Sequence, residues 1–140
     1  MDTEIDLFDL LRERYNQIRK EILNQWDAVG TVPISHSEWL IIGKLYKQGD
    51  ATISSIAKSA NITRQASHKF MKSLEGKGIV EISPSTVNRK EKQFRLTKLG
   101  KDCFQTFMSI KASIERDIEE HIGQEEMALL KKLLQENWGY

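Results

Sequence analysis

Five side chains that can donate hydrogen bonds lie within one short segment of the chain, between Thr63 and Gly76. At about 100° per residue, a helix in this segment places them on one side, opposite an apolar stripe of Ala66, Phe70 and Leu74. Arginine can pair with guanine O6 and N7, glutamine with adenine N6 and N7, and lysine with phosphates. The pattern predicts a helix that enters the major groove of DNA, although an ordinary surface helix also carries lysine and arginine. The five residues are Arg64, Gln65, His68, Lys69 and Lys72.

A second candidate contact is the charged stretch Asn88-Arg89-Lys90-Glu91-Lys92. It follows Val80-Glu81-Ile82-Ser83 and precedes Gln93-Phe94-Arg95-Leu96, and both flanks alternate apolar with polar residues, as half-buried strands do. A basic hairpin tip beside a recognition helix can reach the phosphate backbone or the minor groove. On its own, the same stretch would also fit a solvated loop.

The distribution of charge supports both candidates. Residues 51–101 contain eleven lysines and arginines against three acids, a net charge of +8, whereas the remainder of the chain carries −7. Such segregation indicates a polyanion-binding module on an acidic scaffold. The predicted DNA-binding residues are Thr63, Arg64, Gln65, Ser67, His68, Lys69 and Lys72 of the helix and Asn88, Arg89 and Lys90 of the hairpin tip.

The elements around the helix form a recognisable unit. Thr52 can cap a short helix, Asn61-Ile62 forms a turn, and Thr63 caps the next helix, an order that matches a helix-turn-helix. Ser35, Thr52 and Thr63 could contact phosphates at these helix N-termini, but capping is the simpler role. Upstream, Ser35 and Glu38 have the spacing of a capping box.

Long amphipathic helices flank this unit. Apolar residues at steps of three and four predict a helix from Phe8 to Val29, another from Thr97 to about Ile122, and a last one carrying Met127 to Trp138. These apolar faces exceed what a small winged-helix core can bury, which indicates a dimerisation domain. The alternative is an intramolecular helical bundle.

The predicted fold is mainly α, a winged helix-turn-helix with a two-stranded β wing, flanked by helices that form the dimerisation domain. Its predicted parts are residues 1–33 for the first dimerisation helix, 34–100 for the DNA-binding lobe and 101–140 for the remaining dimerisation helices.

Enzymatic chemistry finds little support in the sequence. His36, His68 and His121 are dispersed, and no metal-ligand spacing, nucleophile motif or phosphate loop is present, so we expect no cofactor, no metal and no catalysis. The single cysteine, Cys103, lies in an apolar stripe, which favours packing over redox sensing. The acidic start, Met1-Asp2-Thr3-Glu4, and the absence of a long apolar run predict a cytoplasmic protein without a membrane partner.

Several motifs between residues 34 and 100 resemble the MarR family of bacterial transcription regulators. They are Ile34-Ser35-His36-Ser37-Glu38-Trp39, Ile53-Ser54-Ser55-Ile56-Ala57, Ile62-Thr63-Arg64-Gln65, Leu74-Glu75-Gly76-Lys77-Gly78-Ile79-Val80 and Leu96-Thr97-Lys98-Leu99-Gly100.

This resemblance implies a homodimer that binds palindromic operator DNA, usually as a repressor released by a small-molecule effector or by oxidation. Family wings often carry Asp-x-Arg, where this chain has Asn88-Arg89-Lys90. The family's pocket lies beside the dimerisation helices, where Tyr15, Trp26, His36 and Trp39 are candidate ligand-binding residues, although aromatics at helical spacing are more often core. The alternative function is a winged-helix protein-interaction module without specific DNA binding.

Overall fold

The computed structural model describes residues 5–30, 32–84 and 91–140. The chain divides into two compact units. Trp26–Phe107 form one of them, called the winged-helix lobe below. Residues 1–25 and 108–140 form the other, called the helical unit. Among the described residues, no helix combines the length and the apolar composition needed to cross a membrane.

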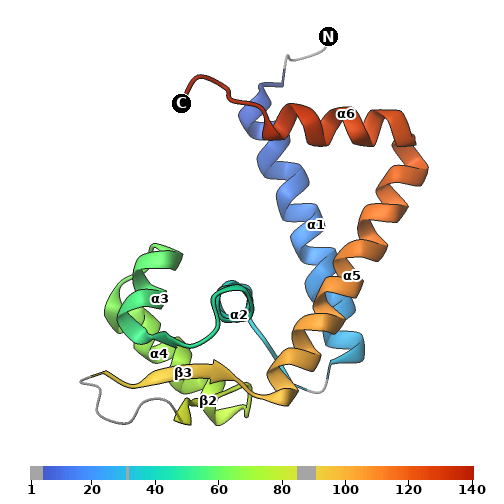
Figure 1. Ribbon diagram of the computed structural model, residues 1–140. Coiled ribbons are helices and arrows are strands. Elements are labelled where there is room, and N and C mark those ends of the chain that lie inside the picture. The colour runs from blue at the N-terminus through green and yellow to red at the C-terminus, as the bar shows by residue number, and fades with distance from the viewer. Residues whose placement is uncertain (1–4, 31, 85–90) are drawn as a thin grey trace. The chain divides into compact units, whose positions relative to one another are not determined.

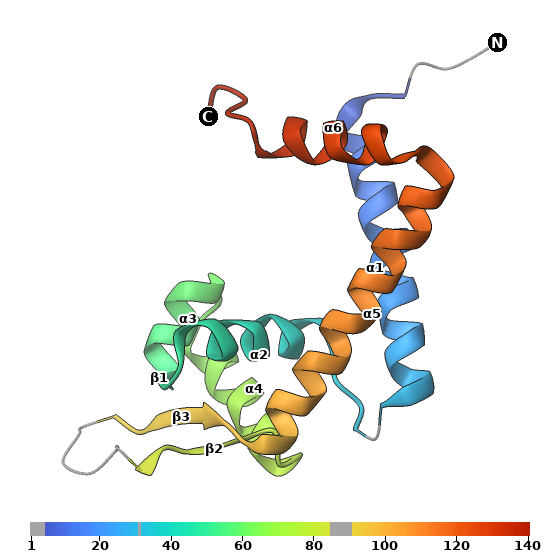
Figure 2. The same ribbon diagram turned by 45° about the vertical axis from the view of Figure 1, so that its right-hand side comes forward.

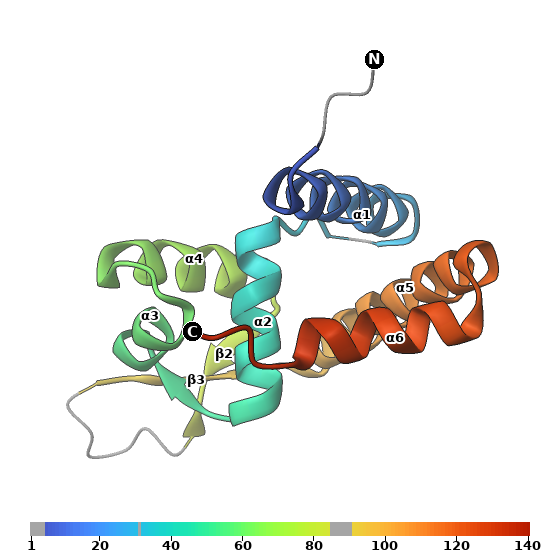
Figure 3. The same ribbon diagram turned by 90° about the horizontal axis from the view of Figure 1, so that it is seen from above.

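The winged-helix lobe packs three helices against a small antiparallel sheet with the strand order β1-β3-β2. Figure 3 shows α3 and α4 on the same side of α2. The core consists of completely buried aliphatic side chains from all three helices and from the start of the hairpin. The elements are α2 (His36–Gln48), β1 (Ala51–Thr52), α3 (Ile53–Ala60), α4 (Arg64–Gly76), β2 (Val80–Ile82) and β3 (Gln93–Leu96).

The predicted hairpin is confirmed, and the structure adds a third strand to it. Val80 pairs with Leu96 and Ile82 with Phe94, which fixes the antiparallel register of β2 and β3 (Figure 2). On its other edge, β3 pairs with β1 through Ala51 opposite Phe94. A two-residue strand has no alternation that a sequence pattern could reveal, which is why β1 was not predicted.

A tight joint connects the end of α4 with β2 and with the start of α5 (Lys98–Ile122). Gly78 has a positive φ of 77°, a conformation that glycine adopts without strain. The Thr97 hydroxyl donates to the carbonyl of Gly78 at 2.6 Å and accepts from the N–H of Gly100 at 3.1 Å. A Cβ on Gly100 would overlap the carbonyl oxygen of Ile79. These contacts give the Lys-Gly-Ile-Val and Leu-Thr-x-x-Gly motifs a structural role.

The helical unit contains most of α1 (Leu7–Val29), most of α5 (Lys98–Ile122) and all of α6 (Gln124–Gln135), which are labelled in Figure 1. The predicted ends of these helices at Val29 and at Ile122 are confirmed. Within this unit, Lys131 of α6 forms an ion pair with Glu115 of α5 at 2.9 Å. Its described part buries only three large apolar side chains, those of Ile110, Ile114 and Met127.

Candidate nucleic-acid interface

A helix-turn-helix is formed by α3 and α4, as predicted. Asn61 ends α3 in the left-handed conformation with φ 55°, which asparagine tolerates better than most residues. The N–H of Ile62 donates to the carbonyl of Ala57 at 2.9 Å and closes the turn. The Thr63 hydroxyl then accepts from the N–H of Ala66 at 3.0 Å. This cap satisfies one of the free N–H groups at the start of α4.

The outer face of α4 carries the five side chains that the sequence placed there. All five are exposed, and the described part of α4 between Arg64 and Lys72 contains no acid. This face therefore offers both bidentate groups and positive charges to a partner. The five are Arg64, Gln65, His68, Lys69 and Lys72.

The inner face of α4 differs slightly from the predicted stripe. Leu74 is completely buried as expected, whereas Ala66 and Phe70 are only half-buried. Met71, which the sequence analysis did not place in the stripe, is completely buried. The helix is thus rotated so that a line through residues 67, 71 and 74 faces the core.

This rotation removes Ser67 from the set of predicted DNA contacts. Its side chain is 0% exposed, and its hydroxyl donates to the carbonyl of Ile53 in α3 at 2.8 Å. A buried hydroxyl needs such a partner. Ser67 consequently holds α4 against α3 and does not face a ligand, so its assignment to the interface was wrong.

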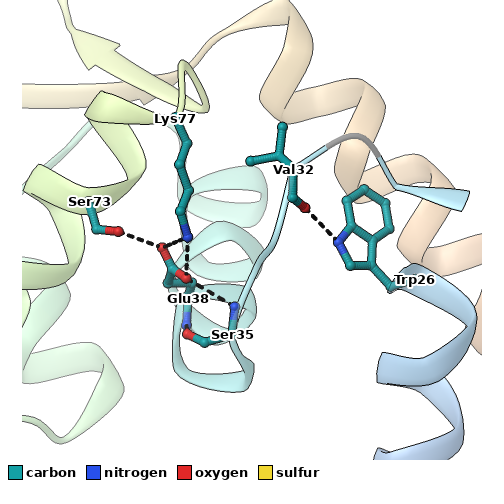
Figure 4. Close-up of polar contacts among 6 residues, drawn as sticks. All are labelled: Trp26, Val32, Ser35, Glu38, Ser73 and Lys77. Atoms are coloured by element: carbon teal, nitrogen blue, oxygen red, sulfur yellow. Dashed lines mark hydrogen bonds and ion pairs between the residues drawn. The ribbon is translucent and has the colours of Figure 1, made fainter. Parts of the chain in front are cut away.

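The opposite end of α4 is held by a buried carboxylate from α2. Figure 4 shows Glu38, which is 4% exposed, between Ser35, Ser73 and Lys77. Lys77 Nζ lies 2.8 and 2.9 Å from the two carboxylate oxygens, and the Ser73 hydroxyl donates to one of them at 3.1 Å. The N–H of Ser35 also donates to Glu38 at 3.0 Å, which completes the predicted capping box.

The ionisation of Glu38 follows from these contacts. Burial alone would raise the pKa of this carboxyl, but the hydrogen bonds from Lys77 and Ser35 and the positive charge of Lys77 together lower it below its usual value. Glu38 is therefore a carboxylate at neutral pH, and it fixes the C-terminal end of α4 from α2.

The wing contributes charged residues beside α4. Asn88, Arg89 and Lys90 lie outside the described residues, so their predicted DNA contacts stay predictions. Lys92 is described and exposed. Lys92 and Glu91 line a cleft of about 390 Å³ together with residues of α4 and apolar side chains of the sheet.

One contact in this cleft was missed by the sequence analysis. Arg64 Nη2 lies 3.1 Å from Glu91 Oε1, and the same oxygen accepts a hydrogen bond from the Ser54 hydroxyl at 2.8 Å. The sequence offered one signal, an acid within an otherwise basic hairpin tip. Sequence spacing could not indicate which cation that acid meets.

The four candidate ligand-binding residues are distributed over both units. Trp26 and Trp39 are each 2% exposed and pack edge to face with ring centroids 4.9 Å apart. Trp26 Nε1 donates to the carbonyl of Val32 at 2.9 Å (Figure 4). His36 begins α2 and is half-buried, whereas Tyr15 belongs to the helical unit and is exposed.

Trp39 has a further property. Its ring stacks on Phe107 at a centroid distance of 4.0 Å, and its buried Nε1 finds no hydrogen-bond acceptor among the residues that the structure describes. An unsatisfied buried donor is uncommon in a native protein and requires an explanation.

Cys103 is buried, as its place in an apolar stripe predicted. Burial, and secondarily the charge of Asp102, raises the pKa of its thiol, which disfavours the reactive thiolate. Within the described ranges, no cluster of three or more His, Cys, Asp or Glu side chains could hold a metal ion.

Comparison with known proteins agrees with this description. Residues 34–92 match the model of the MarR family, the family that the sequence motifs resemble. No curated protein sequence is significantly similar to the chain.

Solved structures match over nearly the whole chain. MepR of Staphylococcus aureus, a transcription regulator of the multidrug efflux pump MepA, matches with a TM-score of 0.76 at 20% identity, over 93% of this chain and 94% of its own. A mutant of MarR from Escherichia coli matches with a TM-score of 0.78 at 16% identity, over 96% and 97%. YusO of Bacillus subtilis matches with a TM-score of 0.75 at 21% identity, over 94% of both chains. The chain therefore has the fold of the MarR-family transcription regulators.

Proposed function

We propose that this chain, whose residues 34–92 match the model of the MarR family, is a transcription regulator that binds double-stranded DNA sequence-specifically. The observation that carries the proposal is the exposed face of α4, on which Arg64 and Gln65 stand at the first turn of the helix. The first turn of a recognition helix is the part that contacts base edges. We assign base reading to Arg64, Gln65 and His68, and phosphate contacts to Lys69 and Lys72.

The hairpin completes the proposed interface. We assign Asn88, Arg89 and Lys90 to the phosphate backbone or the minor groove, whose negative potential attracts arginine and lysine. Thr63 remains at the edge of the interface, because its hydroxyl caps α4 while its side chain is exposed.

The proposed regulator is a homodimer that binds a palindromic operator. The helical unit supports this part, because many of its large apolar side chains are exposed in a single chain, and such surfaces mark association sites. A two-fold dimer presents two recognition helices to the two halves of a palindrome. The exposed apolar residues of the helical unit are Ile5, Leu7, Phe8, Leu10, Leu11, Tyr15, Met108, Ile122, Leu129, Leu130, Leu133, Leu134, Trp138 and Tyr140.

We also propose that the chain is a repressor released by a small-molecule effector. The supporting observation is the buried Nε1 of Trp39, which has no acceptor among the described residues and could donate to an acceptor on an apolar ligand. A change in indole fluorescence on ligand addition that is lost in Trp39→Phe would support this assignment, and an unchanged response in that variant would contradict it.

The experiment that tests DNA binding is selection of bound fragments from a random duplex pool, followed by a salt titration on the selected sequence. Counterion release makes affinity fall steeply with salt when phosphates are contacted. Failure to enrich any sequence, together with salt-independent or absent binding, would favour the alternative of a protein-interaction module.

A further inference from the structure

The cleft between α4 and the wing contains an acid, Glu91, that lies beside the basic start of α4. Glu91 lies two residues before β3, yet its Oε1 accepts a hydrogen bond from the Ser54 hydroxyl near the start of α3 at 2.8 Å. The same oxygen forms an ion pair with Arg64 Nη2 at the start of α4, at 3.1 Å. The carboxylate thus joins the wing to both helices of the helix-turn-helix. Ser54 holds this carboxylate independently of Arg64.

This contact does not contribute much to the stability of the fold. The Arg64 side chain is 72% exposed and the Glu91 side chain 41% exposed, and ion pairs in water contribute only ~0–1 kcal/mol. A negative charge at this place also repels a polyanion such as DNA. On a DNA-binding surface such a charge lowers general affinity, and the ion pair with Arg64 is the contact through which Glu91 can act on recognition.

We propose that Glu91 is a positioning residue for DNA recognition, which holds the Arg64 guanidinium toward a base edge and keeps it away from the phosphate backbone. A guanidinium has five N–H donors, so an ion pair between Nη2 and Glu91 leaves enough donors for a bidentate pair with guanine O6 and N7. Preorganising this side chain lowers the cost of ordering it on binding. The inference rests on the proposed function and specifies how the site selects its sequence.

The test compares Glu91→Ala with Glu75→Ala. Glu75 lines the same cleft, is exposed, and forms no ion pair within the part of the chain that the structure describes. Affinities are measured at one salt concentration for the selected operator and for a scrambled duplex. Both variants should bind scrambled DNA more tightly, because each removes a repelling charge. Only Glu91→Ala should lower the ratio of operator to scrambled affinity, by about fivefold or more, a part of the discrimination that one bidentate contact supplies.

The same comparison in an Arg64→Ala background tests whether Glu91 acts through Arg64. In that background, Glu91→Ala should leave the affinity ratio unchanged. An unchanged ratio in the Glu91→Ala single variant, or an equal loss with and without Arg64, would overturn the positioning role. A wild-type protein that does not distinguish operator from scrambled DNA would instead contradict the proposed function. Circular dichroism melts of every variant show whether the fold is retained.

Discussion

The winged-helix lobe and the helical unit differ in how far they bury their apolar side chains. In the lobe, aliphatic side chains such as Ile42, Ile56 and Leu74 are completely buried by the lobe's own elements. Five large apolar side chains are exposed in the described part of the lobe, compared with fourteen in the described part of the helical unit. The lobe therefore buries a core of its own, whereas the helical unit leaves many large apolar side chains exposed in the single chain.

The polar contacts that join the elements of each unit show the same contrast in burial. The lobe fixes both ends of α4 with buried groups, the Ser67 hydroxyl at one end and the Glu38 carboxylate at the other. In the helical unit, the described ion pair between Lys131 and Glu115 has both side chains about half exposed. The difference is consistent with the proposed division of roles, in which the lobe binds DNA and the helical unit forms the dimer.

The largest effect is expected from charging the helical unit. Leu133 of α6 is 46% exposed, and Leu133→Lys would place an ammonium group in the proposed dimer interface. Wild-type protein should sediment at about twice 16.2 kDa, and the variant should dissociate. Loss of bivalent binding should then reduce operator affinity by about 10²–10⁴-fold.

Gln135→Lys is the matched control for this experiment, because it adds the same charge to the same helix at an exposed polar position. It should leave both mass and affinity near the wild-type values. A wild-type protein that is monomeric at micromolar concentration would contradict the proposed dimer. The exposed apolar faces of the helical unit would then not be a dimer interface.

The second effect concerns the stability that the buried pair of Glu38 and Lys77 gives to the lobe. Glu38→Gln removes one charge from a buried pair, which costs ~3–5 kcal/mol when both partners are fully buried. Because the Lys77 side chain is 25% exposed, we expect a smaller loss of unfolding free energy, about 2–4 kcal/mol at pH 7. Urea unfolding measures this loss, and Glu81→Gln, in the exposed pair with Arg95, should cost less than about 1 kcal/mol.

The pH dependence of this loss has a defined sign. The folded pKa of Glu38 is lowered, so its contribution is fully present above the unfolded carboxyl pKa of about 4.3 and is lost as the pH falls through the folded value. The stability difference between wild type and Glu38→Gln should therefore shrink toward pH 3. A difference that stays constant with pH would show that the ionised form of Glu38 is not what stabilises the lobe.

The third effect separates the proposed roles of α4 and the wing within the lobe, which are sequence discrimination for α4 and general DNA affinity for the wing. Arg64→Ala or Gln65→Ala should reduce discrimination between operator and scrambled DNA by ~1–3 kcal/mol for each bidentate pair removed. The double variant Arg89→Ala, Lys90→Ala should weaken binding to both duplexes alike. Because up to two phosphates would no longer be neutralised by each of two subunits, the slope of log affinity against log salt should flatten by up to ~3–4 units. Salt titrations in which the wing variant loses discrimination and the helix variants keep it would reverse this assignment.

Local patterns were sufficient to predict much of the fold. The capping box of Ser35 and Glu38 marked the start of α2, and the alternation around Val80 and Phe94 marked the hairpin. These features depend on residues within a few positions of one another, so their spacing is visible in the sequence. The exposed face of α4 followed from the same helical period.

One wrong assignment and two contacts that were not predicted involve residues whose contact partners are distant in the sequence. Ser67 was assigned to the interface because a helical projection cannot fix the rotation of α4 against α3, which depends on packing. The contacts from Glu38 to Lys77 and from Glu91 to Arg64 span 39 and 27 positions. No periodicity relates such residues, and only the tertiary structure brings them together.

The smallest effect is expected from Cys103, which lies in the lobe on α5. Its thiol is buried, and burial together with Asp102 raises its pKa, so little thiolate forms at neutral pH for a peroxide to attack. Cys103→Ser should therefore leave DNA affinity and its response to peroxide unchanged, as measured by binding titrations before and after oxidation. Peroxide-induced release of DNA that disappears in Cys103→Ser would mean that this side chain becomes accessible. Part of the lobe would then also expose a buried side chain, and the difference in burial between the two units would be smaller than described above.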